Sequence, residues 1–158
     1  SAQVRLGPMS ALKDQIRADL KEAMKAKKKE RTGTIRMLLA AIQTAETEGS
    51  KHEVSDDEIQ KIIAREIKKR RESAEIYQTN GREELAEAEL NEAAILESYQ
   101  PQQLTDEELA SLIDEVVNRL GATSMAQMGD VMKAATAEAA GRADGKRLSG
   151  AVRARLGN

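Results

Sequence analysis

The chain contains almost no aromatic residues, and this scarcity limits its possible folds more than any other feature. Tyr77 and Tyr99 are its two aromatic residues, and phenylalanine, tryptophan and cysteine are all absent. Sandwiches and barrels of β-strands draw on aromatic and β-branched side chains, so both are disfavoured. Charged residues make up 33% of the chain, and alanine, glutamate, lysine, leucine and arginine are abundant, which favours α-helices.

Apolar residues recur every three or four positions along most of the chain, which is typical of one buried face of an α-helix. This pattern predicts seven helices, with starts near residues 10, 32, 55, 82, 105, 124 and 144. Ser55 and Thr105 each precede a glutamate by three residues, a capping-box pattern that marks a helix start. We therefore expect an all-α protein with a four-helix N-terminal bundle followed by a small three-helix C-terminal domain.

Pro101 marks the predicted boundary between the two domains. A proline disfavours helical geometry in the residue before it, here Gln100, and cannot donate a backbone hydrogen bond. We expect an N-terminal helical domain over residues 9–100 and a C-terminal tail domain over residues 101–158. Residues 1–8, ahead of Met9, are expected to be leftover expression sequence.

The formal net charge of −2 hides a strong segregation of charge along the chain. Residues 13–36 carry nine basic and four acidic side chains, and residues 61–71 carry six basic and one acidic. Residues 83–115 hold eleven acidic side chains and no lysine or arginine, whereas residues 133–158 hold six basic and two acidic ones. Because cysteine is absent and no apolar run approaches the roughly 18 residues of a membrane span, we expect a cytoplasmic protein without a membrane partner.

The common catalytic motifs are missing from the sequence. There is no phosphate-binding loop, dinucleotide-binding glycine pattern, zinc-protease motif or serine-hydrolase elbow. A cysteine-based zinc site is impossible, and His52, the single histidine, lies in a polar loop where an inert role is expected. We expect no catalytic residue, no metal and no cofactor.

Basic residues of the third predicted helix form a candidate RNA-binding ridge. Lys61, Arg65, Lys68 and Arg71 recur every three or four residues opposite a stripe of isoleucines, and Lys69 is an alternative to Lys68. Such a ridge could neutralise RNA phosphates and release their counterions. The alternative is a solvated helix face that is paired with neighbouring glutamates.

The tail supplies a second candidate RNA-binding set. It combines glycines with basic side chains, namely Gly129, Lys133, Gly141, Arg142, Lys146 and Arg147. Residues 141–146 precede a helix N-terminus, where backbone amides can bind a phosphate and glycine allows close backbone approach. Gly129 is explained either by close helix packing or by backbone contact with RNA. Without an aromatic in the tail, base stacking is excluded, so recognition would rely on phosphates and shape.

The tail also resembles the GatB/YqeY family. The resemblance rests on residues 128–133 (MGDVMK), residues 141–146 (GRADGK), and the closing Val152 and Leu156. Further segments that resemble the free-standing, YqeY-like members of this family are residues 12–25, 34–42, 81–86 and 99–104. Gln100 departs from the family's Tyr-Leu-Pro pattern, which is a small change within the hinge.

The resemblance implies an all-helical, two-domain protein whose tail is related to that of the B subunit of glutamine-dependent aspartyl/glutamyl-tRNA amidotransferase. In that enzyme the tail helps to hold tRNA while other domains perform the chemistry. We therefore expect a helical module that binds tRNA or another structured RNA, without catalysis of its own. Two alternatives stay open, a protein-interaction adaptor with a protein partner and a component of glutamine-dependent amide transfer with carbon–nitrogen ligase activity.

Overall fold

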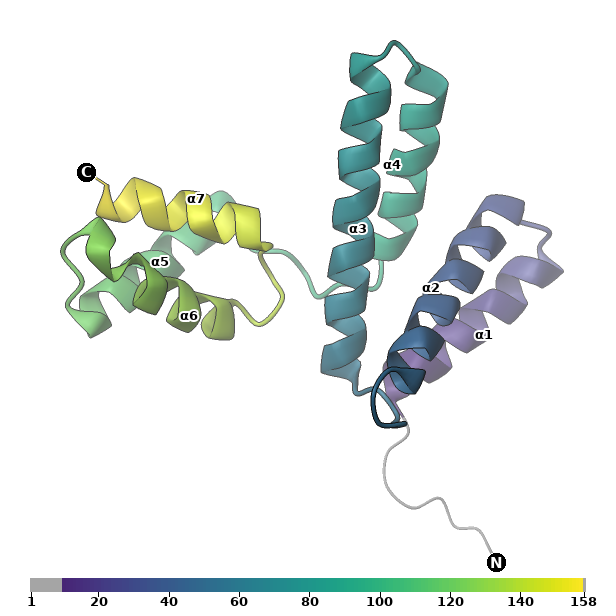
Figure 1. Ribbon diagram of the computed structural model, residues 1–158, viewed down its shortest axis with the longest axis horizontal. Coiled ribbons are helices and arrows are strands. Elements are labelled where there is room, and N and C mark those ends of the chain that lie inside the picture. The colour runs from purple at the N-terminus through teal and green to yellow at the C-terminus, as the bar shows by residue number, and fades with distance from the viewer. Residues whose placement is uncertain (1–9, 158) are drawn as a thin grey trace, which may run out of the picture. The chain divides into compact units, whose positions relative to one another are not determined.

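The computed structural model describes residues 10–157, and every regular element in that range is helical, which confirms the prediction of an all-α protein (Figure 1). The expected leftover segment, residues 1–8, lies outside the described residues. The α-helices are α1 (Ala11–Lys25), α2 (Lys29–Thr47), α3 (Asp56–Thr79), α4 (Glu83–Glu97), α5 (Asp106–Leu120), α6 (Met128–Ala139) and α7 (Gly145–Leu156). A short 3₁₀ helix, η1 (Met125–Gln127), precedes α6.

The chain divides into two compact units, and the division falls between Tyr99 and Gln100. The first unit contains α1 to α4 and the second contains α5 to α7. Each unit has its own cluster of buried apolar residues.

The first unit consists of two helical hairpins, α1–α2 and α3–α4, which lie together at one end and diverge toward the other (Figure 1). Its core cluster takes Ile59, Ile62, Ile63 and Ile67 from the first half of α3. From α4 it takes only Ala93 and Leu96, near the C-terminal end. The far half of the α3–α4 hairpin therefore contributes nothing to this core.

The two capping boxes predicted from the sequence are both present. Ser55 and Thr105 each form the full capping box, in which the hydroxyl and a glutamate carboxylate each accept a backbone N–H. The sequence places Thr32 or Thr34 near the start of the second helix, and α2 begins slightly earlier, at Lys29. Lys27 adopts a left-handed conformation with φ 57° and reverses the chain directly after α1, so the next helix can begin at once.

The second unit packs α5, α6 and α7 around an aliphatic core that includes Ile113, Val116, Val131 and Val152. The segment before α5 is tied to the turn between α6 and α7, because the Leu104 amide donates a 2.8 Å hydrogen bond to the Arg142 carbonyl.

Candidate nucleic-acid interface

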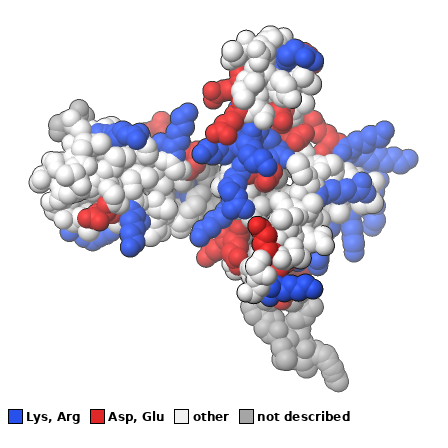
Figure 2. Space-filling model, in the orientation of Figure 1, with Lys and Arg blue, Asp and Glu red and all other residues white. Residues whose placement is uncertain are grey.

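Three of the predicted phosphate-binding cations lie together on the solvent side of α3. Lys61, Arg65 and Lys68 are exposed and fall on one strip of the helix surface, because they are separated by four and then three residues. Within residues 10–157, none of the three has an ion pair or a side-chain hydrogen bond. Figure 2 shows basic side chains gathered over α3 on the visible face, with acidic ones beside them. We call these three residues the α3 ridge.

Arg71, the fourth predicted member, is placed differently from the ridge. Its guanidinium forms an ion pair with the carboxylate of Glu97 on α4, so it links the two helices of the hairpin. The alternative member, Lys69, lies 3.5 Å from Glu66 in a pair on the same helix. The structure therefore brings Lys61, Arg65 and Lys68 together and ties Arg71 and Lys69 to acidic neighbours.

A buried arginine that the sequence analysis did not single out fixes α3 in the first unit. Arg70 is 6% exposed, and its Nε donates to Glu92 Oε1 on α4 at 3.0 Å. Its Nη1 donates to the Glu66 carboxylate at 2.8 Å. The sequence could have indicated a buried, paired arginine. Arg70 falls on the apolar stripe between Ile67 and Ala74, and it follows a glutamate by four residues.

The electrostatics of this cluster favour ionised carboxylates. Burial alone would raise the pKa of Glu66, but the hydrogen bond from Arg70 and the charges of Lys69 and Arg70 outweigh it and lower that pKa. The cluster is thus charged and internally matched. Glu66 pairs with Arg70 and Lys69 and with none of the three cations of the ridge.

In the tail, two of the four predicted cations are engaged in contacts within the second unit. Arg142 Nε donates to the Gln102 carbonyl at 2.8 Å, and Arg147 Nη2 donates to Asp106 Oδ1 at 2.9 Å. Lys133 and Lys146 are exposed and, within the described part of the chain, have no such contact. Lys133 borders an open apolar depression of 470 Å³ between α5 and α6, whereas Lys146 lies in the first turn of α7.

One backbone amide at the start of α7, where an anion site is expected, already has a partner in the protein. Asp144 caps this helix, and its carboxylate accepts the Arg147 backbone N–H at 2.8 Å. A phosphate at this helix start would meet the negative charge of Asp144. Anion binding by these backbone amides stays a prediction.

The two predicted glycines differ in what they allow. Gly129 is exposed, and a Cβ added there would meet nothing within 4 Å, so close helix packing does not explain it. Gly141 has φ +81°, a backbone conformation that favours glycine, and an added Cβ would lie 3.5 Å from Cγ of Pro101. Gly141 therefore has a structural role in closing α6.

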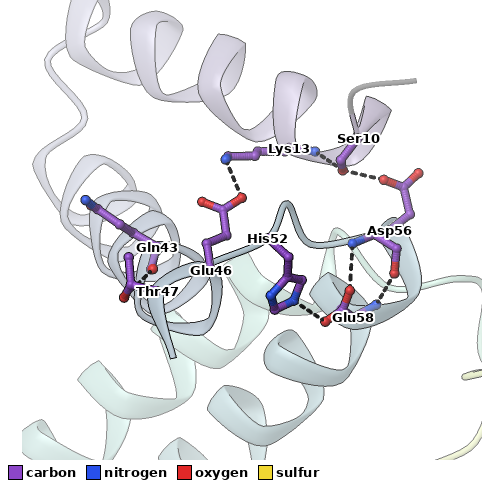
Figure 3. A network of polar contacts seen from close by, with 9 residues as sticks. Ser10, Lys13, Gln43, Glu46, Thr47, His52, Asp56 and Glu58 are labelled. Carbon is purple, nitrogen blue, oxygen red and sulfur yellow. Dashed lines mark hydrogen bonds and ion pairs between the residues drawn. The ribbon is translucent and has the colours of Figure 1, made fainter. Parts of the chain in front are cut away.

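His52 lies in the loop between α2 and α3, where its ring faces Glu58 (Figure 3). Its Nδ1 lies 3.0 Å from the Ser50 carbonyl, and its Nε2 lies 3.1 Å from Oε2 of Glu58, a member of the Ser55 capping box. These two contacts, the Ser50 carbonyl first, raise the pKa of His52. The same region includes a 2.7 Å ion pair between Lys13 and Glu46 and a hydrogen bond from Ser10 to Asp56. The network joins α1, α2 and α3 at the end where the hairpins meet.

Comparison with known protein families decides the relationship of this chain. The sequence profile of the family described as "Yqey-like protein" matches residues 13–156, which include the α3 ridge and the tail. The chain belongs to the YqeY-like family. The resemblance inferred from the sequence is thereby confirmed.

Curated relatives of this family member come from yeasts, and each is named "Altered inheritance of mitochondria protein 41, mitochondrial". The protein of Clavispora lusitaniae is 32% identical over 114 residues, which cover 71% of this chain and 66% of the relative. That of Kluyveromyces lactis is 36% identical over 100 residues, covering 63% and 52%. That of Meyerozyma guilliermondii is 37% identical over 84 residues, covering 53% and 43%. The chain thus spans between 43% and 66% of the length of these three relatives.

The names of these relatives contradict the prediction of a cytoplasmic location, since all of them are called mitochondrial. That prediction rested on the absence of cysteine and of a long apolar run. Neither feature distinguishes one compartment from another. The cytoplasmic assignment is therefore wrong.

The described residues contain neither a metal-binding cluster nor a membrane-spanning helix. Among residues 10–157, no group of three or more histidine, cysteine, aspartate or glutamate side chains is arranged to hold a metal ion. None of the helices in that range is both long enough and apolar enough to cross a membrane.

Proposed function

We propose that this YqeY-like protein binds structured RNA, with tRNA as the first candidate, through the α3 ridge together with Lys133 and Lys146. The observation that supports the proposal is the set of three exposed cations on one strip of α3 that have no acidic partner within residues 10–157. Unpaired cations on a rigid helix can neutralise phosphates without first giving up an internal contact. Each neutralised phosphate releases counterions, which favours binding.

The dimensions of the ridge suit a run of phosphates. Lys61 and Lys68 are seven residues apart, which corresponds to about 10 Å along the helix axis. Because the tail has no aromatic side chain, recognition would depend on the spacing of phosphates and the shape of the RNA. The choice of tRNA follows from the resemblance of the tail to that of the tRNA amidotransferase B subunit.

The proposal assigns a role to each part of the chain. The helices α1 to α4 act as a four-helix bundle that presents the ridge, and α5 to α7 act as a three-helix tail domain that adds Lys133 and Lys146. No catalysis of its own is proposed, since His52 is exposed and both of its ring nitrogens have partners. Purified protein should accordingly release no glutamate from glutamine in the presence of misacylated tRNA.

The deciding experiment is a salt titration of tRNA binding measured by fluorescence anisotropy. Wild-type protein is compared with a ridge variant, Lys61→Ala/Arg65→Ala/Lys68→Ala. The matched control is Lys21→Ala/Lys25→Ala/Lys28→Ala, which removes three exposed cations from α1 and the turn after it. Circular dichroism checks that both variants keep their helices.

We expect wild-type binding to weaken steeply as salt rises. The ridge variant should bind more weakly at every salt concentration, and its plot of log K against log salt should be less steep by about 2 to 3 units. The control variant should stay close to wild type. Equal losses in both variants would mean that overall charge, not the ridge, attracts the RNA, and absence of binding at low salt would refute the proposal.

A further inference from the structure

The far end of the α3–α4 hairpin is strongly acidic. The half of α3 nearest the core carries the ridge, whereas the far end of the hairpin, residues 72–91, contains six acidic side chains and one basic. The basic residue, Arg82, lies 3.4 Å from Glu84 and is thereby matched. Two surfaces of opposite charge thus share one hairpin, and the RNA-binding function proposed above uses only the basic one.

The acidic end also carries an apolar face that the first unit leaves partly uncovered. Ile62 and Ile63 lie in the core. Ile76 and Tyr77 each follow one of them by 14 residues. Fourteen residues are about 40° short of four full helical turns, so each pair lies on nearly the same side of α3. The side of α3 that packs into the core therefore continues to these two positions. There Ile76 is 62% exposed and Tyr77 is only half-buried.

The same continuity holds on α4. Leu96 is buried in the core, and Leu85 precedes it by 11 residues, close to three full turns, so both lie on the same side of the helix. Leu85 is half-buried but belongs to neither core cluster. Figure 1 shows why, since the α1–α2 hairpin diverges from α3–α4 before the far end is reached.

We propose that the far end of the α3–α4 hairpin, residues 72–91, docks a basic amphipathic helix of another protein. Ile76, Tyr77 and Leu85 would receive its apolar side chains, in the manner of a helix that lays its apolar face on a helical surface. The surrounding glutamates would attract its lysines and arginines. Tyrosine is enriched at protein interfaces, and within the described residues the Tyr77 hydroxyl has no hydrogen bond, so it is available to a partner.

The charge of this surface selects the occupant. RNA is disfavoured, because its phosphates would approach an excess of carboxylates. A second copy of the same surface is disfavoured for the same reason, since like charges would be brought together. A basic amphipathic helix would match both the apolar side chains and the glutamates of this surface.

The test uses a defined probe, an 18-residue helical peptide of leucine and lysine with leucines spaced by three and four residues. The control peptide has glutamate in place of every lysine. Binding to the full chain is measured by fluorescence anisotropy, and the contact surface is mapped by backbone NMR shifts. The protein variants are Ile76→Gln, which changes an exposed side chain, and Glu75→Gln/Glu87→Gln. Met24→Gln is the matched control, because Met24 is 48% exposed but lies within residues 13–36, where basic side chains outnumber acidic ones.

We expect the lysine peptide to bind, with the largest shifts at residues 73–77 and 85–89, and the glutamate peptide not to bind. Ile76→Gln should weaken binding at least fivefold, the charge variant at least threefold, and Met24→Gln less than twofold. The proposal is overturned if no binding occurs, if the shifts lie elsewhere, or if Met24→Gln weakens binding as much as Ile76→Gln. It is also overturned if sedimentation shows that the wild-type chain self-associates and that Ile76→Gln abolishes this self-association. None of these outcomes depends on RNA binding by the ridge.

Discussion

The hydroxyl of Tyr99 donates a 2.5 Å hydrogen bond to Oδ2 of Asp19, a residue 80 positions earlier in the chain. Asp19 lies on α1, and Tyr99 follows the end of α4, so this contact joins the first and last helices of the first unit. The Tyr99 carbonyl also accepts a 2.7 Å hydrogen bond from Gln60 on α3. One residue at the division between the two units therefore holds three helices together.

Replacing Tyr99 with phenylalanine should lower the free energy of unfolding by about 1.5 kcal/mol, because a hydrogen bond to an ionised carboxylate is lost. Urea denaturation followed by circular dichroism measures this change. Tyr77→Phe is the matched control and should have little effect, since no hydrogen bond to its hydroxyl is present among residues 10–157. Equal losses in both variants would contradict the assigned role.

The same contact predicts a dependence on alkaline pH. Burial first, and then the hydrogen bond to Asp19, raise the pKa of Tyr99 above its ordinary value of 10.0. The folded state therefore keeps the phenol proton after the unfolded state has lost it. This contribution to stability is complete below about pH 10 and declines as the pH rises further. Urea midpoints measured from pH 8 to 11 should fall more steeply for wild type than for Tyr99→Phe.

Arg70→Met should destabilise the first unit by about 3 kcal/mol, because it removes a buried guanidinium that pairs with both Glu66 and Glu92. Arg71→Met removes an exposed pair with Glu97 and should change stability by less than about 1 kcal/mol. Urea midpoints of the two variants provide the comparison. A small effect at Arg70 would show that the buried cluster is unimportant for folding.

Alanine at the two tail glycines should have opposite effects. Gly129→Ala should stabilise the second unit by about 0.5–1 kcal/mol, because alanine favours helix and its Cβ meets no neighbour. Gly141→Ala should destabilise it by about 1–2 kcal/mol, because alanine is strained at φ +81°. Thermal unfolding of both variants tests the signs. If Gly129→Ala also weakens tRNA binding, backbone contact at this position is supported.

His52 offers a measurement that needs no unfolding. As the single histidine, it can be titrated by NMR, and its midpoint should lie above the ordinary value of 6.5 because of the Ser50 carbonyl and Glu58. Glu58→Gln should lower that midpoint. Since a raised pKa of histidine stabilises the folded state only while the ring is protonated, this contribution fades as the pH rises through that midpoint. A midpoint unchanged in Glu58→Gln would show that the contact is not formed in solution.

Local features of the fold were accessible from the sequence because they depend on residues close together in the chain. The capping boxes at Ser55 and Thr105 each involve two residues that are three positions apart. The start of α2 could not be predicted exactly, because it follows the left-handed conformation of Lys27, and lysine is not a residue type that indicates this conformation.

The candidate site was predicted only in part for a similar reason. Spacing identified Lys61, Arg65, Lys68 and Arg71 as one ridge, but it could not show that Arg71 reaches Glu97 on the neighbouring helix. In the tail, sequence identified the cations but not that Arg142 and Arg147 contact Gln102 and Asp106, some 40 residues away. The family relationship, by contrast, could be inferred from the order and spacing of short segments.

By itself, the sequence determined that this protein is helical, because the scarcity of aromatic residues and the spacing of apolar ones are properties of the chain alone. Only the tertiary structure decided which charges are engaged and which apolar residues are covered. Arg70 is buried and matched while Lys68, two residues earlier, is exposed, and Ile76 is exposed although Ile62 on the same side of α3 is buried. The physical reason is that burial and ion pairing depend on which helix lies alongside, and that is set by contacts between distant parts of the chain.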